Sequence, residues 1–92
     1  MSTIRRVGVI GAGVMGARIA AHFANAGVPV ELLDIVLPGE ADRNAAARRG
    51  LEAARTQRPP AFYSAEGLKR VRIGNLEDNV DRLGACDWVI EG

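Results

Sequence analysis

The stretch "VGVIGAGVMGARIA", residues 7–20, places Gly11, Gly13 and Gly16 between a run of β-forming residues and a helical pattern. Glycine inside a strand or a helix costs roughly 0.5–1 kcal/mol relative to alanine, so three such residues need a backbone reason. In a strand–turn–helix unit, the first glycine permits a sharp turn and the second lets a pyrophosphate approach the backbone. The third lets the helix pack closely on the sheet. We therefore interpret the stretch as a dinucleotide-binding turn.

Short apolar segments alternate with helical patterns along the rest of the chain. This order predicts right-handed crossovers and an open parallel sheet. We expect an α/β fold of the Rossmann type, with strand order 3-2-1-4 and truncated after the fourth strand. All of residues 1–92 are assigned to this one unit. The expected strands are 6–10, 30–33, 71–73 and 88–90; the expected helices run from Val14 to a C-cap at Gly27, from Glu40 to Arg58 and from a cap at Ser64 to Lys69, with a helical turn or two at 78–83.

An acidic residue, Asp34, ends the second expected strand, at about the 20-residue distance from the glycine turn that the dinucleotide-binding pattern requires. A carboxylate at this place accepts hydrogen bonds from the adenosine ribose hydroxyls and repels a 2′-phosphate. No basic residue follows until Arg43. The expected cofactor is therefore NAD rather than NADP.

Composition excludes several classes of partner. The 92 residues are 48% hydrophobic with a net charge of +1, which describes an ordinary globular unit and does not favour nucleic acid. No stretch reaches the roughly 20 apolar residues that span a bilayer, so no membrane insertion is expected. Arg5 and Arg6 precede an apolar run as in a secretory signal, but Arg18 interrupts that run. Cys86 is the only cysteine, so a disulfide and a CxxC metal site are excluded and a reducing cytoplasm is expected.

Residues 7–34 resemble the N-terminal NAD-binding domain of the 3-hydroxyacyl-CoA dehydrogenase family. The resemblance continues in "NAAARRGLEAA", residues 44–54, and in "ACDWVIE", residues 85–91. The GxGxMG form of the turn, with Met15, is shared with other 3-hydroxyacid dehydrogenases, which mostly favour NADP. The long arginine-bearing second helix and the "DWVIE" strand favour the acyl-CoA family. That family oxidises the 3-hydroxyl of an acyl-CoA to a ketone in fatty-acid β-oxidation, passing hydride to NAD.

The resemblance also implies a set of cofactor contacts. The residues of the turn would hold the pyrophosphate, Asp34 with Ile35 beside it would hold the adenosine ribose, and Glu91 would lie by the nicotinamide half. No metal ligand is expected, and no catalytic residue either, because the family's histidine–glutamate pair lies beyond Gly92. We therefore expect these 92 residues alone to bind NAD weakly without turnover. The predicted cofactor-binding residues are Gly11, Ala12, Gly13, Val14, Met15, Gly16, Asp34, Ile35 and Glu91.

Several points stay open at this stage. The intact enzyme would bind acyl-CoA and form a homo-oligomer, and the long loop "LPGEADRN" looks like that of large members that also carry an enoyl-CoA hydratase region. The family usually has alanine where this chain has Gly92. The alternatives are another GxGxMG 3-hydroxyacid dehydrogenase or a nucleotide-binding module without chemistry. Arginines 48, 49 and 55 form a solvated helix face or contact CoA phosphates; His22, Cys86, Phe62, Tyr63 and Trp88 are interpreted as packing or surface residues.

Overall fold

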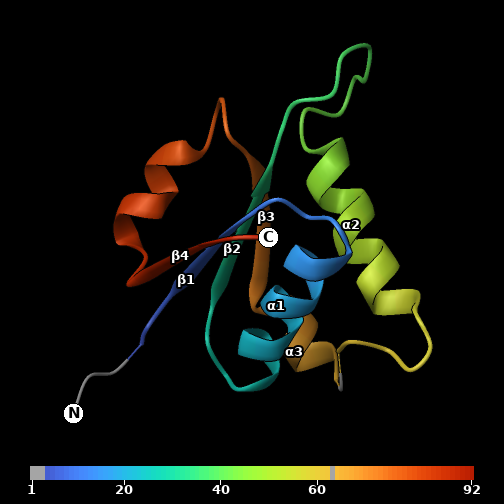
Figure 1. Ribbon diagram of the computed structural model, residues 1–92, viewed down its shortest axis with the longest axis vertical. Helices are drawn as coiled ribbons and strands as arrows, with labels where there is room; N and C mark the ends of the chain where they lie inside the picture. Colours follow the sequence, from blue (N-terminus) through green and yellow to red (C-terminus); the bar gives the residue numbers. More distant parts are fainter. Residues whose placement is uncertain (1–3, 63) are drawn as a thin grey trace.

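The computed structural model describes residues 4–62 and 64–92. Its centre is a sheet of four parallel strands in the order β3-β2-β1-β4 (Figure 1). This confirms the Rossmann-type sheet and the strand order expected from the sequence. The strands are β1 (Val7–Ile10), β2 (Val30–Asp34), β3 (Val71–Asn75) and β4 (Trp88–Glu91).

The connections between strands use both faces of the sheet. The helices α1 (Val14–Asn25), α2 (Ala45–Thr56) and α3 (Ala65–Lys69) lie together on one face, and the 3₁₀ helix η1 (Val80–Ala85) lies on the other (Figure 1). The chain therefore changes face between β3 and β4. In open α/β sheets, ligands bind outside the carboxyl ends of the strands at such a switch point. The switch point here lies beside β1.

The helix α1 packs on the sheet through small residues. Its larger apolar residues lie at the margin: Met15 is 66% exposed, while Ile19 and Phe23 are partly buried against the core. Because small side chains let a helix backbone approach the strands closely, α1 sits directly on β1 and β2. The buried positions of α1 are Gly16, Ala17, Ala20, Ala21 and Ala24.

The opposite face of the sheet holds a buried carboxylate that the sequence analysis did not single out. Glu31 of β2 is 1% exposed, and its Oε2 accepts a hydrogen bond of 2.8 Å from Arg6. Its Oε1 lies 3.5 Å from Nη1 of Arg82 and 4.0 Å from Nε of Arg72, without a hydrogen bond. A buried charge is tolerated only when it is paired. The three arginines supply that pairing.

The helix α2 starts at Ala45, five residues later than the sequence predicts. The carboxylate of Asp42 accepts the N–H of Asn44 at 2.9 Å. This bond gives the backbone N–H of Asn44 a partner that does not require a helix. Buried Asn75, at the end of β3, donates to Oδ1 of Asn44 at 2.8 Å. These bonds accompany a bend at 41–42 and a turn at 43–44, and the expected start at Glu40 is wrong. The helix ends at Thr56, because the next residue is extended.

The other boundaries differ by small shifts. The strands β2, β3 and β4 run one or two residues past the expected ends, and the helical turn before β4 lies at Val80–Ala85. Gly27, at φ +91°, follows the end of α1, and the Ser64 side chain accepts the N–H of Gly67 at 3.2 Å. The Ser64 cap is as predicted, whereas the C-cap of α1 is Ala26, one residue before the expected Gly27.

The residues that the sequence analysis interpreted as packing residues differ in how deeply they are buried. Phe62 is buried, while Tyr63 lies outside the described residues. Trp88 is 52% exposed, because β4 is an edge strand, and its ring meets that of Phe23 edge to face at 6.2 Å. Trp88 therefore packs against Phe23 at the margin of the described core. Cys86 is partly buried, and this burial raises the pKa of its thiol.

Exposed His22 packs its ring against Phe23, as expected of a surface residue. Among the described residues, no helix is long and apolar enough to cross a membrane.

The close packing of α1 generates a stability prediction. Ala20 is fully buried between α1 and the sheet, so Ala20→Leu should lower the free energy of unfolding by about 1–3 kcal/mol through overpacking. Urea unfolding followed by circular dichroism measures this change. Arg18→Leu, at an exposed position of the same helix, is the control and should stay within about 0.5 kcal/mol of the parent. Equal stability of the two variants would contradict the packing described.

Candidate dinucleotide-binding site

Two glycines of the turn have the backbone roles that the sequence predicts. Gly11 has φ +97°, a conformation that L side chains rarely adopt, and its N–H donates to the carbonyl of Leu33 at 2.7 Å. At Gly16 a Cβ would overlap the carbonyl oxygen of Gly11. The first glycine therefore makes the turn out of β1, and the third lets α1 pack against that turn.

Gly13 is different, because nothing inside the protein requires a glycine there. Its φ of −66° and ψ of −173° suit any residue, and a Cβ would meet no atom within 4 Å. It is the N-cap of α1, without a side-chain cap and without an acidic residue in the first turn. The free N–H groups and the positive dipole end of such a helix favour an anion. The open space before Gly13 is therefore suited to a phosphate group.

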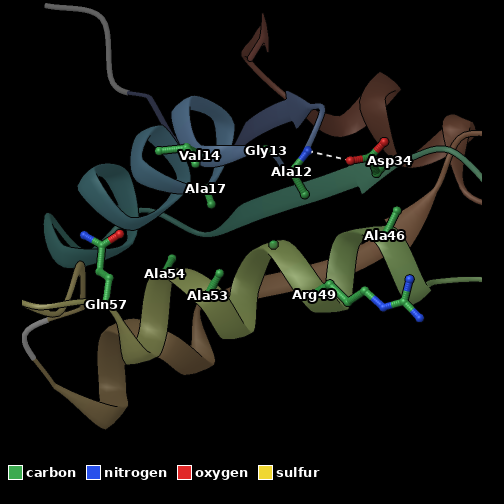
Figure 2. A pocket seen from close by; sticks show the side chains of 11 residues that line it. Ala12, Gly13, Val14, Ala17, Asp34, Ala46, Arg49, Ala53, Ala54 and Gln57 are labelled. Carbon is green, nitrogen blue, oxygen red and sulfur yellow. Dashed lines mark hydrogen bonds between the residues drawn. The ribbon is translucent and has the colours of Figure 1, made fainter.

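Asp34 is tied to the turn by its own side chain. Its Oδ2 accepts the N–H of Ala12 at 2.7 Å (Figure 2). Its Oδ1 accepts the N–H of Ile35 at 2.7 Å. An ionised carboxylate offers about four acceptor positions, so two remain for ribose hydroxyls. Sequence reasoning placed Asp34 at the ribose but did not foresee that it also holds the turn.

A cavity of about 390 Å³ lies between the turn and α2. Figure 2 shows α2 running beneath the turn, with Ala46, Arg49, Ala53 and Ala54 on the helix side and Ala12 and Val14 on the turn side. Asp34 and Gly50 also line this cavity. Sequence analysis missed Gly50 as a lining residue and gave Arg49 no place at the site. The signal that could have revealed this contact was Gly50 itself, a glycine inside an otherwise alanine-rich helix.

The remaining predicted residues lie around the same edge of the sheet. Val14, Met15 and Ile35 are 72%, 66% and 53% exposed, which leaves apolar surface open beside the turn. Glu91 ends β4 and pairs in register with Ile10, so it lies on the other side of β1 from Asp34. The structure thus brings the predicted set together at the carboxyl ends of β1, β2 and β4. Their contacts with the cofactor stay a prediction.

Gly92, where the family usually has alanine, packs against the turn. A Cβ on Gly92 would lie 2.9 Å from the nitrogen of Gly16 and 3.0 Å from the carbonyl oxygen of Gly11. Both distances are tighter than ordinary van der Waals contact. Glycine at position 92 therefore allows the backbone after β4 to approach the backbone of the turn closely.

The arginines of α2 each have an acidic partner. Arg48 donates to Asp42 at 2.7 Å, Arg49 pairs with Glu40, and Arg55 pairs with Glu52. The hydrogen bond from Arg48 lowers the pKa of the Asp42 carboxyl, and that from Arg55 lowers the pKa of the Glu52 carboxyl. A charge-balanced, solvated helix face accounts for these residues, and a contact with CoA phosphates stays a prediction. In the described part of the chain, no cluster of histidine, cysteine and acidic residues could hold a metal ion.

Comparison with known proteins points to one family. The family model for the NAD-binding domain of 3-hydroxyacyl-CoA dehydrogenase matches residues 6–92. A probable 3-hydroxyacyl-CoA dehydrogenase of Deinococcus radiodurans is 53% identical over 88 residues, which are 96% of this chain and 25% of that protein. One of Bacillus subtilis is 39% identical over 102 residues, covering 96% of this chain and 13% of that protein. The chain thus spans a quarter or less of these two relatives.

The same family appears among solved structures. The crystal structure of 3-hydroxybutyryl-CoA dehydrogenase from Escherichia coli K12 matches with a TM-score of 0.68 and 32% identity, over 98% of this chain and 19% of that one.

The position of Asp34 predicts how cofactor choice changes when its carboxylate is removed. Asp34→Ala should weaken NADH binding about tenfold or more, because hydrogen bonds to a charged group are lost. NADPH binding should weaken less, because a repulsive charge disappears as well. Fluorescence titration with both cofactors measures the two affinities. Asp81→Ala, an exposed acidic position in η1, is the control; an unchanged NADH/NADPH ratio for Asp34→Ala would contradict the assignment.

The open space at Gly13 predicts a separation of folding from binding. Gly13→Val should fold like the parent, because its backbone angles are ordinary and its Cβ meets nothing. The side chain would occupy the space of the pyrophosphate, so NAD affinity should be abolished. Circular dichroism checks the fold and calorimetry the binding. Gly84→Val, where a Cβ also meets nothing, should bind normally, and tight binding by Gly13→Val would mean that the phosphates lie elsewhere.

Proposed function

Because the chain belongs to the family of 3-hydroxyacyl-CoA dehydrogenase NAD-binding domains, we propose that it serves the oxidation of the 3-hydroxyl group of an acyl-CoA to a ketone. The NAD that this family binds accepts the hydride in that reaction. One observation carries the proposal: open space at Gly13 and the Asp34 carboxylate, which is hydrogen-bonded to Ala12, occur in the same turn region. A tight turn without a ligand needs neither feature.

The residues of this chain bind and orient the cofactor. The N–H groups at the start of α1 would bind the pyrophosphate, and the two remaining acceptor positions of Asp34 would bind the adenosine ribose. Glu91 lies on the side of β1 away from Asp34, where the nicotinamide half would extend. The chain thus supplies mainly the half of the site that holds ADP. No group described here is assigned the proton transfer from the hydroxyl.

Selectivity for NAD over NADP follows from the charges around the ribose site. A carboxylate repels a 2′-phosphate, and a selective NADP site would need a free guanidinium nearby. Arg43 donates to Asp78 at 2.6 Å, and Arg49 pairs with Glu40. Arg49, which lines the cavity beside Asp34, and Arg43, the first basic residue after Asp34 in the chain, thus each have an acidic partner.

The acyl-CoA substrate and the assembly concern the whole protein. We propose a 3-hydroxyacyl-CoA substrate because the family and the E. coli structure carry such names. We also propose that the whole protein forms a homo-oligomer, as the resemblance to the family implies. A lone, unpaired Cys86 supports a location in the cytoplasm. The long loop 35–44 supports a place among the large members that also carry a hydratase region.

A chimera tests the proposed activity. The Deinococcus radiodurans relative, with its matching 88 residues replaced by this chain, should oxidise 3-hydroxybutyryl-CoA with NAD, as followed by the absorbance of NADH. The same chimera carrying Gly13→Val is the matched control and should lose this activity. The 92-residue chain alone should bind NAD without turnover. A folded chimera that binds NAD but oxidises nothing would favour a nucleotide-binding module without chemistry.

A further inference from the structure

The middle of α2 touches the glycine turn with its backbone, at Gly50. A Cβ at Gly50 would overlap the carbonyl oxygen of Ala12, and it would lie 2.6 Å from the Cβ and 2.8 Å from the carbonyl carbon of Ala12. Real Cβ atoms essentially never come within 3.0 Å of such neighbours. Glycine is among the least favourable residues for a helix interior, and α2 is otherwise rich in alanine. The glycine is therefore explained by what it touches.

We propose that Gly50 is a positioning residue of the NAD site, a fourth glycine of the dinucleotide-binding motif that is contributed by the second helix. The proposal rests on NAD binding at the turn. Beyond NAD binding, a residue of α2 then restricts the conformation of the turn at residues 11–13. The residue acts through the peptide group between Ala12 and Gly13.

The geometry of that peptide explains the effect. A trans peptide is planar, so its carbonyl and its N–H point in opposite directions. The carbonyl of Ala12 faces α2 at Gly50, and the N–H of Gly13 therefore points away from α2. On the other side, the N–H of Ala12 is held by Oδ2 of Asp34 at 2.7 Å. Ala12 is thus bound at its N–H and packed against Gly50 at its carbonyl, and the direction of the Gly13 N–H follows from that of the carbonyl.

A side chain at position 50 would disturb this arrangement in one of two ways. Either α2 moves away from the turn, or the Ala12 carbonyl rotates and takes the Gly13 N–H with it. The rotation re-aims the Gly13 N–H, a donor at the start of α1, where the phosphate is expected. The movement of α2 removes the contact that limits the Ala12 carbonyl to one direction. A donor that no longer points at a charged acceptor costs about tenfold or more in affinity.

The experiment uses the 92-residue chain with the substitution Gly50→Ala, which by itself favours helix. Fluorescence titration with NADH should show affinity reduced about tenfold or more. In ligand-free ¹H–¹⁵N NMR spectra, the amide signals of Gly13 and Val14 should shift. Two controls are matched to it: Gly84→Ala adds a methyl where a Cβ meets nothing, and Ala47→Gly destabilises α2 from the buried core. Both should keep the NADH affinity and the two amide signals.

A second pair of variants keeps the inference testable if Gly50→Ala does not fold. Ala12→Gly together with Gly50→Ala removes the Cβ that lies 2.6 Å away and gives residue 12 the freedom to turn its carbonyl from the new methyl. This double variant should regain part of the fold, while its NADH affinity stays reduced because the Gly13 N–H turns with the carbonyl. A double variant with the NADH affinity of the parent, or one no better folded than the single variant while Ala12→Gly alone folds, would overturn the proposal. So would unchanged affinity and unchanged amide signals in Gly50→Ala. Failure of the parent chain to bind NADH would instead contradict the proposed function, and the ligand-free spectra would still decide the role of Gly50.

Discussion

The hydrogen bond from the Ala12 N–H to the Asp34 carboxylate joins the two strand ends on which the site depends. It links the turn after β1 to the end of β2, beside the bond from the Gly11 N–H to the Leu33 carbonyl. The carboxylate that would recognise the ribose is thus also part of the wall that shapes the phosphate site. A group with both duties is held in place before the ligand arrives, which lowers the cost of ordering it on binding.

The packing of the helices likewise depends on small side chains. The helix α1 meets the sheet through alanines and Gly16, and α2 meets the turn through Gly50, so backbone approaches backbone at each contact. Close contact of this kind tolerates little change, because one added methyl has nowhere to go. It also leaves the core with few large side chains. Stability and site geometry consequently depend on the same small residues.

The parts of the fold that were predictable from sequence are those encoded locally. The β-forming run, the glycine spacing and the acidic residue at the end of the second strand predicted the turn and the helix after it, because each signal lies within a few residues of the structure it specifies. The strand order was predictable for another reason, the alternation of strands and helices along the chain. The start of α2 was missed because Asn44 is engaged by Asn75 from another strand. The buried Glu31 with its three arginines, and the contact of Gly50 with Ala12, likewise join residues far apart in the chain. A periodic pattern holds no information about such partners.

The strand order gives these long-range contacts their importance for function. Since β1 lies between β2 and β4, a dinucleotide with its ribose at Asp34 must cross the turn after β1 to reach Glu91. The turn is therefore the one place that both halves of the cofactor share. Backbone that packs on it from α2, or from the end of β4 at Gly92, can change the binding of the whole molecule without touching it. Gly50 and Gly92, two glycines outside the recognisable motif, thus pack against the turn as Gly16 does within it.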